Sequence, residues 1–249
     1  MTGLLRDRID GRPVRSGQAQ VTDQLGRDIV GGRIAVGDLL PGDDALAARF
    51  GVSRTVLRET LKTLAAKGLV LARPRTGTRV LERRSWNLLD ADVLGWHVDH
   101  GLDGTFLREL TEMRLALEPA MAALAAGRAS AQEIAAMRAA ADAMDAAEGD
   151  RAFALADLAF HRSLIEASGN MLMHSAGSVI EAALLSVFRL GSPANDPKVQ
   201  AEVVAAHRAV VERISQGDAE GAAESARHII GLGRTRVLAA PAPDDAGPK

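Results

Sequence analysis

The sequence predicts a mainly α-helical protein, in which a small N-terminal domain of three helices and a β-hairpin is followed by a C-terminal all-α antiparallel helical bundle. Two observations lead to this fold class. Alanine is frequent and aromatic residues make up only 3% of the chain, with no tyrosine, a composition that favours helices over strands. Apolar residues also recur at helical spacing over most of the chain, apart from one short hairpin pattern.

The N-terminal elements are separated by residues that typically begin or end helices. Helices are expected over residues 19–31, 43–50 and 54–67, and strands over 69–71 and 78–81. Gly31 ends the first helix, Ser53 caps the third and Gly68 stops it. The turn between the strands lies at 74–77. Helix, helix, short turn, helix and hairpin is the plan of a winged helix-turn-helix, which we place at residues 19–82.

The rest of the chain is helical in pattern. Helices are expected over residues 88–100, 104–127, 130–148, 150–168, 171–190, 197–216 and 218–239. Short breaks at Gly101, Gly149, Gly169 and Gly217 separate several of them. Helices joined by short loops pack as antiparallel neighbours, so residues 88–239 are expected to form one helical domain.

Composition excludes several classes of function. The chain has no cysteine, which rules out disulfides, zinc fingers and thiol catalysis. Any metal must therefore be held by His, Asp or Glu. The N-terminus lacks the apolar core of a signal peptide, and no apolar run approaches the ~18 residues that span a bilayer. We therefore expect a cytoplasmic protein without a membrane partner.

Charge is divided unevenly along the chain. Residues 1–84 hold 16 Lys and Arg against 9 Asp and Glu, a net charge of +7. The remaining residues hold 14 against 23, a net charge of −9. A basic segment joined to an acidic one is typical of a nucleic-acid-binding domain linked to a domain of another kind.

The segment LLPGDDALAARFGVSRTVLRETLKTLAAKGLV, residues 39–70, resembles the DNA-binding domain of the GntR family of bacterial regulators. The shared pattern is a Leu-Pro-x-acid turn, then Leu-Ala, Phe-Gly-Val-Ser-Arg, Arg-Glu and Gly-Leu-Val. The resemblance implies a winged helix-turn-helix that binds a double-stranded DNA operator. Some members carry a basic residue where this chain has Asp44, so a phosphate or base contact there is expected to be missing.

The expected recognition helix begins with residues suited to DNA. Such a helix enters the major groove with its N-terminal residues against base edges. Arg54 and Arg58 lie one turn apart on one face, and arginine pairs bidentately with guanine. Ser53 and Thr55 suit phosphate contacts. The wing supplies four further candidates for a backbone or minor-groove contact: Arg73, Arg75, Thr76 and Gly77. The alternative is that these side chains only solvate the surface.

The helical half resembles the effector domain of the FadR subfamily of GntR regulators. Metal-binding members of that subfamily place Asp-x-x-x-His on one helix and single histidines on two later helices. This chain offers DLAFH, AAHRAVVERI and ESARHII in the matching segments. The resemblance implies four ligands: Asp157, His161, His207 and His228. Such a set suits a divalent metal ion, zinc first and nickel, manganese or iron as options. The alternative is that the histidines are structural.

A further resemblance concerns the effector. EMRLALEPAMAALAA is similar to the subfamily's Arg-x-x-x-Glu helix, and its Arg114 is the expected effector-binding residue, because a guanidinium clamps a carboxylate. A structural ion pair, with Glu118 one turn on, is the alternative. The connecting segment SWNLLDADVLGWHVDHG resembles that of galactonate-operon repressors, which implies a sugar-acid effector; simple packing of this helix is the alternative.

These patterns predict a homodimeric, metal-containing transcriptional regulator, a repressor that a small carboxylate effector releases from its operator. A regulator that senses the metal itself is one alternative. A metal-dependent enzyme is another, although no general base stands apart from the expected ligands. An acyl-CoA-binding regulator is a third, and the resemblance argues against it because members of that type lack these histidines.

Overall fold

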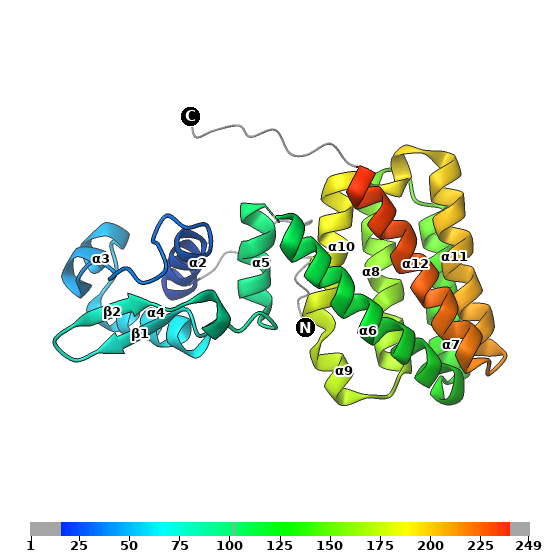
Figure 1. The fold of residues 1–249 in the computed structure, drawn as a ribbon, viewed down its shortest axis with the longest axis horizontal. Coiled ribbons are helices and arrows are strands. Elements are labelled where there is room, and N and C mark those ends of the chain that lie inside the picture. The colour runs from blue at the N-terminus through cyan, green and yellow to red at the C-terminus, as the bar shows by residue number, and fades with distance from the viewer. Residues whose placement is uncertain (1–15, 102, 240–249) are drawn as a thin grey trace. The chain divides into compact units, whose positions relative to one another are not determined.

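The computed structural model describes residues 16–101 and 103–239, and these are helical apart from one two-stranded sheet and the connecting loops (Figure 1). The chain divides into two compact units after Asp103. Within the described ranges no helix is both long and apolar enough to cross a membrane. The predicted fold class, a winged helix-turn-helix followed by a helical bundle, is confirmed.

The first unit contains the three helices and two strands predicted for the winged helix-turn-helix, in the predicted order, followed by two further helices. They are α2 (Gly17–Val30), α3 (Asp43–Phe50), α4 (Arg54–Ala66), β1 (Val70–Arg73), β2 (Gly77–Val80), the short η1 (Arg83–Ser85) and α5 (Ala91–His100). Helix α4 buries a stripe that includes Leu57, Leu61 and Leu64 in one apolar core with residues of α2 such as Leu25 and Ile29. Because these buried positions recur every three or four residues, the opposite face of α4 remains in solvent.

The strands pair antiparallel, with Val70 opposite Val80 and Arg73 opposite Gly77. The segment before α3 pairs with the edge of β2 that does not face β1. Leu40 N–H donates to the Thr78 carbonyl, and Val80 N–H donates to the Asp38 carbonyl. The wing is therefore anchored along one edge by the chain that leads into the helix-turn-helix.

Helix α5 packs in the first unit, although the sequence pattern groups residues 88–100 with the bundle. It begins at Ala91, three residues later than predicted, because the Asp90 carboxylate caps its first turn. The same carboxylate accepts two hydrogen bonds from Lys67 Nζ, at 2.7 and 2.8 Å. Lys67 is the C-cap of α4, so the end of α4 is tied directly to the start of α5.

The second unit is a bundle of longer helices. They are α6 (Gly104–Arg128), α7 (Ala131–Asp145), α8 (Asp150–Ala167), α9 (Met171–Ser175), α10 (Gly177–Gly191), η2 (Pro193–Asn195), α11 (Pro197–Ser215) and α12 (Ala219–Ala239). Helix α12 packs along α6 and α11, and α7 packs against α8 and α11 (Figure 1). Helix α10 packs against α6, α8 and α12.

One helix prediction was wrong. The helix expected over residues 171–190 is two helices, because the chain turns at Ala176, whose φ and ψ are −86° and 1°. The N–H of Ala176 bonds to the Met173 carbonyl, three residues back, instead of continuing the α-helical pattern. Gly177 follows at once, and glycine has a low helix propensity, so the turn falls where the chain least favours a continuous helix.

The contact between α2 and α5 depends on a glycine. A Cβ atom added at Gly26 would overlap the ring of Trp96, which is 1% exposed and donates from Nε1 to Asp23 Oδ1 at 2.9 Å. Gly26→Ala should therefore lower the stability of the first unit by about 1–3 kcal/mol, the usual cost of overpacking. Gly17→Ala, on the same helix with open space around it, is the control.

Thermal unfolding followed by tryptophan fluorescence measures this effect, since both tryptophans of the chain, Trp86 and Trp96, lie in the first unit. The Gly26→Ala protein should melt several degrees below the wild type, and Gly17→Ala should not. Equal melting temperatures for the two variants would contradict the close packing of α2 and α5.

Candidate DNA-binding surface and metal site

The residues predicted for DNA contact all lie in solvent. Ser53, Arg54, Thr55 and Arg58 are exposed at the N-terminal end of α4. The Ser53 hydroxyl also accepts from Val56 N–H at 3.3 Å and so caps α4. The wing residues Arg73, Arg75, Thr76 and Gly77 are exposed as well. The structure thus brings the two predicted sets to the exposed surfaces of one compact unit.

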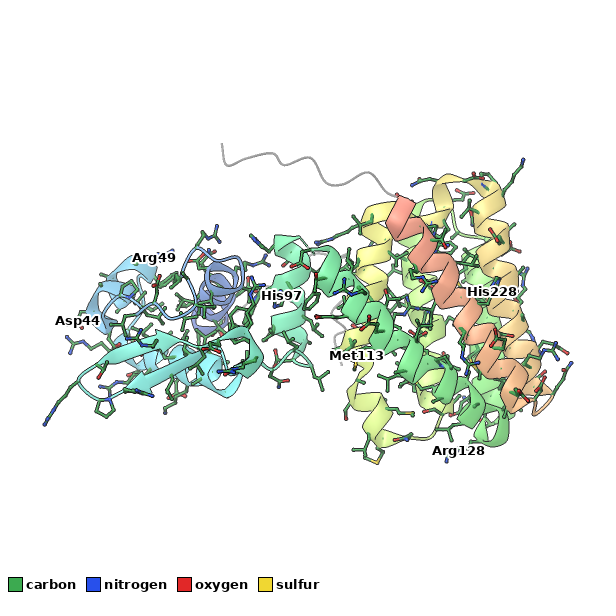
Figure 2. All side chains as sticks on the ribbon, in the orientation of Figure 1. Asp44, Arg49, His97, Met113, Arg128 and His228 are labelled. Atoms are coloured by element: carbon green, nitrogen blue, oxygen red, sulfur yellow. The ribbon has the colours of Figure 1, made fainter. Side chains whose placement is uncertain are left out.

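Asp44 forms an ion pair that the sequence did not predict. Its Oδ1 lies 2.9 Å from Arg54 Nη2, and both side chains are 75% exposed. The position of Asp44 on α3 appears in Figure 2. An exposed pair of this kind adds little stability, so its main consequence is to place a carboxylate beside the first arginine of α4.

A buried carboxylate fixes α3 relative to α2. Asp28 is 2% exposed, and its oxygens accept from Arg49 Nη2 at 2.9 Å and from Gln24 at 3.0 Å. Arg33 Nη2 lies 2.6 Å from the same carboxylate. The sequence analysis missed this residue. The available signal was the position of Asp28 directly before the apolar Ile29 and Val30 of α2, because a buried carboxylate requires partners.

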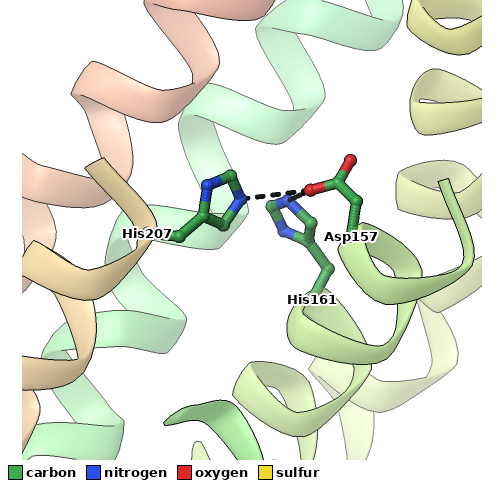
Figure 3. A group of neighbouring side chains, drawn as sticks. All are labelled: Asp157, His161 and His207. Atoms are coloured by element: carbon green, nitrogen blue, oxygen red, sulfur yellow. Dashed lines mark ion pairs between the residues drawn. The ribbon is translucent and has the colours of Figure 1, made fainter. Parts of the chain in front are cut away.

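The second unit brings three of the four predicted metal ligands together. Asp157 and His161 lie one turn apart on α8, and His207 comes from α11 (Figure 3). Each offers one ligand atom within 4.8 Å of the others. Asp157 Oδ1 lies 3.1 Å from His207 Nε2 and 3.5 Å from His161 Nε2. Two imidazoles therefore face one carboxylate oxygen.

The fourth predicted ligand, His228, does not join this group. It is exposed on α12, whereas the next residue, Ile229, is 7% exposed and faces the core (Figure 2). Consecutive residues of an α-helix point about 100° apart. His228 is therefore turned away from the inner face of α12, and the group that could hold a metal ion in this structure consists of Asp157, His161 and His207.

The geometry of the group fits a metal ion. His207 Nδ1 lies 2.7 Å from the Val203 carbonyl, an acceptor only, so Nδ1 carries a proton and Nε2 is the ring nitrogen that faces Asp157. Both Nε2 atoms and His161 Nδ1 are buried, and none of them is aligned for a hydrogen bond, despite the short distances to carboxylates. Buried imidazole nitrogens without aligned partners are costly in an apolar interior, and two imidazoles with a carboxylate are a donor set that a divalent ion accepts.

Arg114 and Glu118 lie beside the group. Both are buried on α6, and Arg114 Nε and Nη2 donate to the two oxygens of Glu118. Glu118 Oε2 in turn lies 2.8 Å from His161 Nδ1. The predicted alternative for Arg114, an ion pair with Glu118, is therefore present. The sequence analysis did not foresee the contact of Glu118 with a metal-ligand candidate.

Opposite charges outweigh burial in this cluster. Burial disfavours charge on each group, but the carboxylates of Glu118 and Asp157 raise the pKa of His161 to about 9. Burial is similarly opposed at Glu118, where Arg114 and His161 lower the pKa to about 2. Contacts with His161 and His207 hold the pKa of Asp157 well below its usual range. The cluster is thus ionised at neutral pH.

A small cavity opens next to Arg114. Its volume is about 20 Å³, and it lies among α6, α10 and α12, with Leu107, Arg114, Ala183 and Ile230 in its wall. This volume holds one water molecule. Arg236 on α12 is a further cation that the sequence analysis missed. Its Nε is buried without a hydrogen-bond partner, and burial lowers its pKa against the influence of Asp157.

Fold and site together define a class of protein: a winged-helix DNA-binding protein joined to a helical domain that contains a buried group of potential metal ligands. Comparisons with known proteins agree with this two-part description. Residues 17–80 match the family described as bacterial regulatory proteins, gntR family, and residues 109–231 match the FCD domain. The chain belongs to the GntR family and is a DNA-binding transcriptional regulator, not an enzyme.

Two relatives from Escherichia coli (strain K12) match most of the chain. The galactonate operon transcriptional repressor is 31% identical, over 86% of this chain and 93% of its own length. The uncharacterized HTH-type transcriptional regulator YieP is 32% identical, over 84% and 90%. The solved structure described as "Lar controls the expression of the Listeria monocytogenes agr system and mediates virulence" covers 92% of this chain and 99% of its own. Its TM-score of 0.62 at 17% identity supports the fold.

The group of three residues leads to a direct prediction. His207→Ala removes one of the three converging donors, so the purified variant should hold no divalent metal or bind it at least tenfold more weakly than the wild type. His228→Ala changes an exposed side chain outside the group, so its metal content should equal that of the wild type. Elemental analysis of the three proteins, purified side by side, measures both. Loss of metal from His228→Ala would restore the four-ligand set.

Proposed function

We propose that this protein is a homodimeric repressor that leaves its operator when a small carboxylate binds at a divalent metal ion held by Asp157, His161 and His207. The observation that carries the proposal is the set of buried, unaligned imidazole nitrogens around Asp157, in a chain whose other unit exposes an arginine-bearing recognition helix. Zinc is our first choice of ion, with nickel, manganese and iron as alternatives. The site of action is the cytoplasm, where operator DNA lies.

Held by Asp157, His161 and His207, a metal ion would supply a Lewis acid with an additional binding position for the effector. Three protein ligands leave at least one coordination position free, since a divalent ion of this kind takes four or more donors. Arg114 borders the adjacent cavity, and the half-buried Arg236 has an Nε without a partner. An anionic effector would relieve the cost of this buried positive charge. A carboxylic acid fits both features.

A sugar acid is the effector class that we favour. The galactonate operon transcriptional repressor, by its name, controls an operon for such an acid, and it is similar to this chain over 86% of the length. The cavity of about 20 Å³ is too small for a sugar acid. Binding therefore requires α6, α10 and α12 to move apart, and this motion is our proposed signal to the DNA-binding unit.

DNA recognition is assigned to the exposed surface of α4 and the wing. Arg54 and Arg58 would read guanines in the major groove, with Ser53 and Thr55 on phosphates. The wing residues would contact the minor groove or the backbone: Arg73, Arg75, Thr76 and Gly77. Two such units in a homodimer match the two halves of a palindromic operator.

A regulator that senses the metal alone is a second candidate. The small volume of the cavity favours it, because an ion needs no further space. The two functions differ in what releases the operator. A metal sensor responds to the ion, whereas our proposed repressor responds to the acid while the ion stays bound.

The test uses full-length protein and an operator selected from random DNA. Fluorescence anisotropy of the operator complex is followed while galactonate and other aldonates, and separately zinc after chelation, are titrated. We expect an aldonate to weaken operator binding at least tenfold, with an unchanged metal content, and His161→Ala to abolish the response. Release by metal alone would support the metal sensor, and indifference to both would refute the proposed mechanism.

The Asp44–Arg54 pair leads to a prediction about specificity. Asp44→Asn removes a negative charge from the DNA-reading surface and frees Arg54 for phosphate. We expect tighter binding to random DNA and a salt dependence that steepens by up to about 0.9 in the slope of log K against log[salt]. The preference for operator over random DNA should fall, because a phosphate contact carries no sequence information.

The matched control is Glu82→Gln, which removes another exposed carboxylate, one that pairs with Arg84 outside α3, α4 and the wing strands. Anisotropy titrations at several salt concentrations compare both variants with the wild type. If the two variants change the salt slope equally, the effect of Asp44 is one of net charge only, and its assigned influence on Arg54 is wrong.

A further inference from the structure

We propose that Glu118 is the positioning residue of the metal site: it accepts the Nδ1–H of His161 and so presents the Nε2 of that ring to the ion. Arg114 holds Glu118 in place for this task. The inference rests on the metal site of the proposed function. It assigns to the Arg114–Glu118 pair a task that is separate from effector binding.

The two nitrogens of His161 face different carboxylates. Nδ1 lies 2.8 Å from Glu118 Oε2, and Nε2 lies 3.5 Å from Asp157 Oδ1. A neutral imidazole has one N–H and one lone pair. The oxygen that accepts the N–H hydrogen bond therefore determines which nitrogen keeps its lone pair and can bind a metal. Of the two nitrogens of His161, it is Nε2 that faces Asp157 Oδ1, the oxygen that His207 Nε2 also faces. A proton held at Nδ1 by Glu118 is therefore the arrangement that turns the lone pair toward the other ligands.

His207 shows the same division of tasks with a different partner. Its Nδ1 lies 2.7 Å from the backbone carbonyl of Val203, and its Nε2 faces Asp157. Each ring is thus positioned through Nδ1 and offers Nε2. A carboxylate that accepts from the Nδ1–H of a histidine raises the basicity of the ring more than a neutral carbonyl does. His161, whose Nδ1 faces the carboxylate of Glu118, should therefore depend more on its partner than His207 does.

The ring of His161 is not fully aligned in the structure. Its Nδ1 is close to Glu118 but is not directed along a hydrogen bond, and its Nε2 is likewise unaligned. Both nitrogens would be satisfied by a small rotation of the ring together with an ion among the three ligands. Glu118 Oε2 lies 2.8 Å from Nδ1, so it defines the orientation toward which the ring would turn.

Stability alone does not account for a buried ion pair at this place. Arg114 and Glu118 are 5% and 2% exposed, one turn apart on the same helix. Apolar side chains of similar size commonly replace a buried pair without loss of stability, because the desolvation of two charges is expensive. The pair holds Glu118 ionised and oriented toward His161, and this is the property that apolar replacements would lose.

The experiment measures Co²⁺ binding to chelator-treated full-length protein by its d–d absorption. The test protein is the double variant Arg114→Leu/Glu118→Leu, which removes both charges together and leaves neither unpaired. Glu118→Gln keeps an acceptor oxygen without the charge. The control is Arg108→Leu/Glu112→Leu, an Arg–Glu pair at the same spacing on the same helix, with both side chains more than 60% exposed.

We expect the buried double variant to bind Co²⁺ about 10–100-fold more weakly, with a changed absorption band. Glu118→Gln should recover most of the affinity and the wild-type band, and the exposed control should match the wild type. A buried double variant with wild-type affinity and band overturns the inference. If that variant does not fold, Glu118→Gln decides: affinity and band identical to those of a Glu118→Leu protein would equally overturn it.

The proposed function fails in a distinguishable way. If the wild type itself takes up no Co²⁺, the three-ligand site is wrong, and the role of Glu118 falls with it. If the wild type binds Co²⁺ and the buried double variant binds it equally well, the site stands and only the positioning role is lost.

Discussion

A row of charges of alternating sign crosses the middle of the second unit, and the arrangement of its helices depends on it. The row runs from Arg114 through Glu118 and His161 to Asp157. Burial opposes each charge, and only a neighbour of opposite sign offsets that cost. Loss of one member would leave another uncompensated, at a cost of about 3–5 kcal/mol. Helices α6 and α8 are therefore held in one relative position, and His207 Nε2, 3.1 Å from Asp157 Oδ1, brings α11 to the same carboxylate.

The same row explains how one ion could influence three helices. Asp157 and His161 belong to α8, His207 to α11, and Glu118 reaches the site from α6. A divalent ion among the three ligands would take the place of a proton on His161, because a coordinating imidazole must be neutral. The alternation of charge would then be preserved. If an effector displaces α6 as proposed, the contact between Glu118 and His161 would change, and effector binding would then also alter the geometry of the metal site.

The fold was predictable wherever side-chain chemistry marks the end of an element. Ser53 and Pro197 begin helices at the predicted residues, because capping oxygens and proline act locally. Tertiary contacts decided the rest. The Asp90 carboxylate caps α5 and also binds Lys67, and the ring of Trp96 packs on Gly26. These contacts join α5 to α2 and α4 over long sequence separations, which no local pattern records. Within the first unit, α5 is therefore tied directly to the recognition helix.

Only the part of the candidate site that lies on one helix could be predicted from helical periodicity. Asp157 and His161 share a face because four residues make about one turn. His228 was assigned from the order of residues in a motif, yet the inner face of α12 follows Ala222, Ala226 and Ile229. Because alanines lie on several faces of α12, the sequence pattern does not show which face of the helix is buried. A shift of one residue turns a side chain by about 100° around the helix axis. Glu118 entered the site from another helix, so its partner could emerge only from the packing of α6 against α8. A set of histidines in the right order therefore indicates a metal site, but the phase of each helix decides which of them are its ligands.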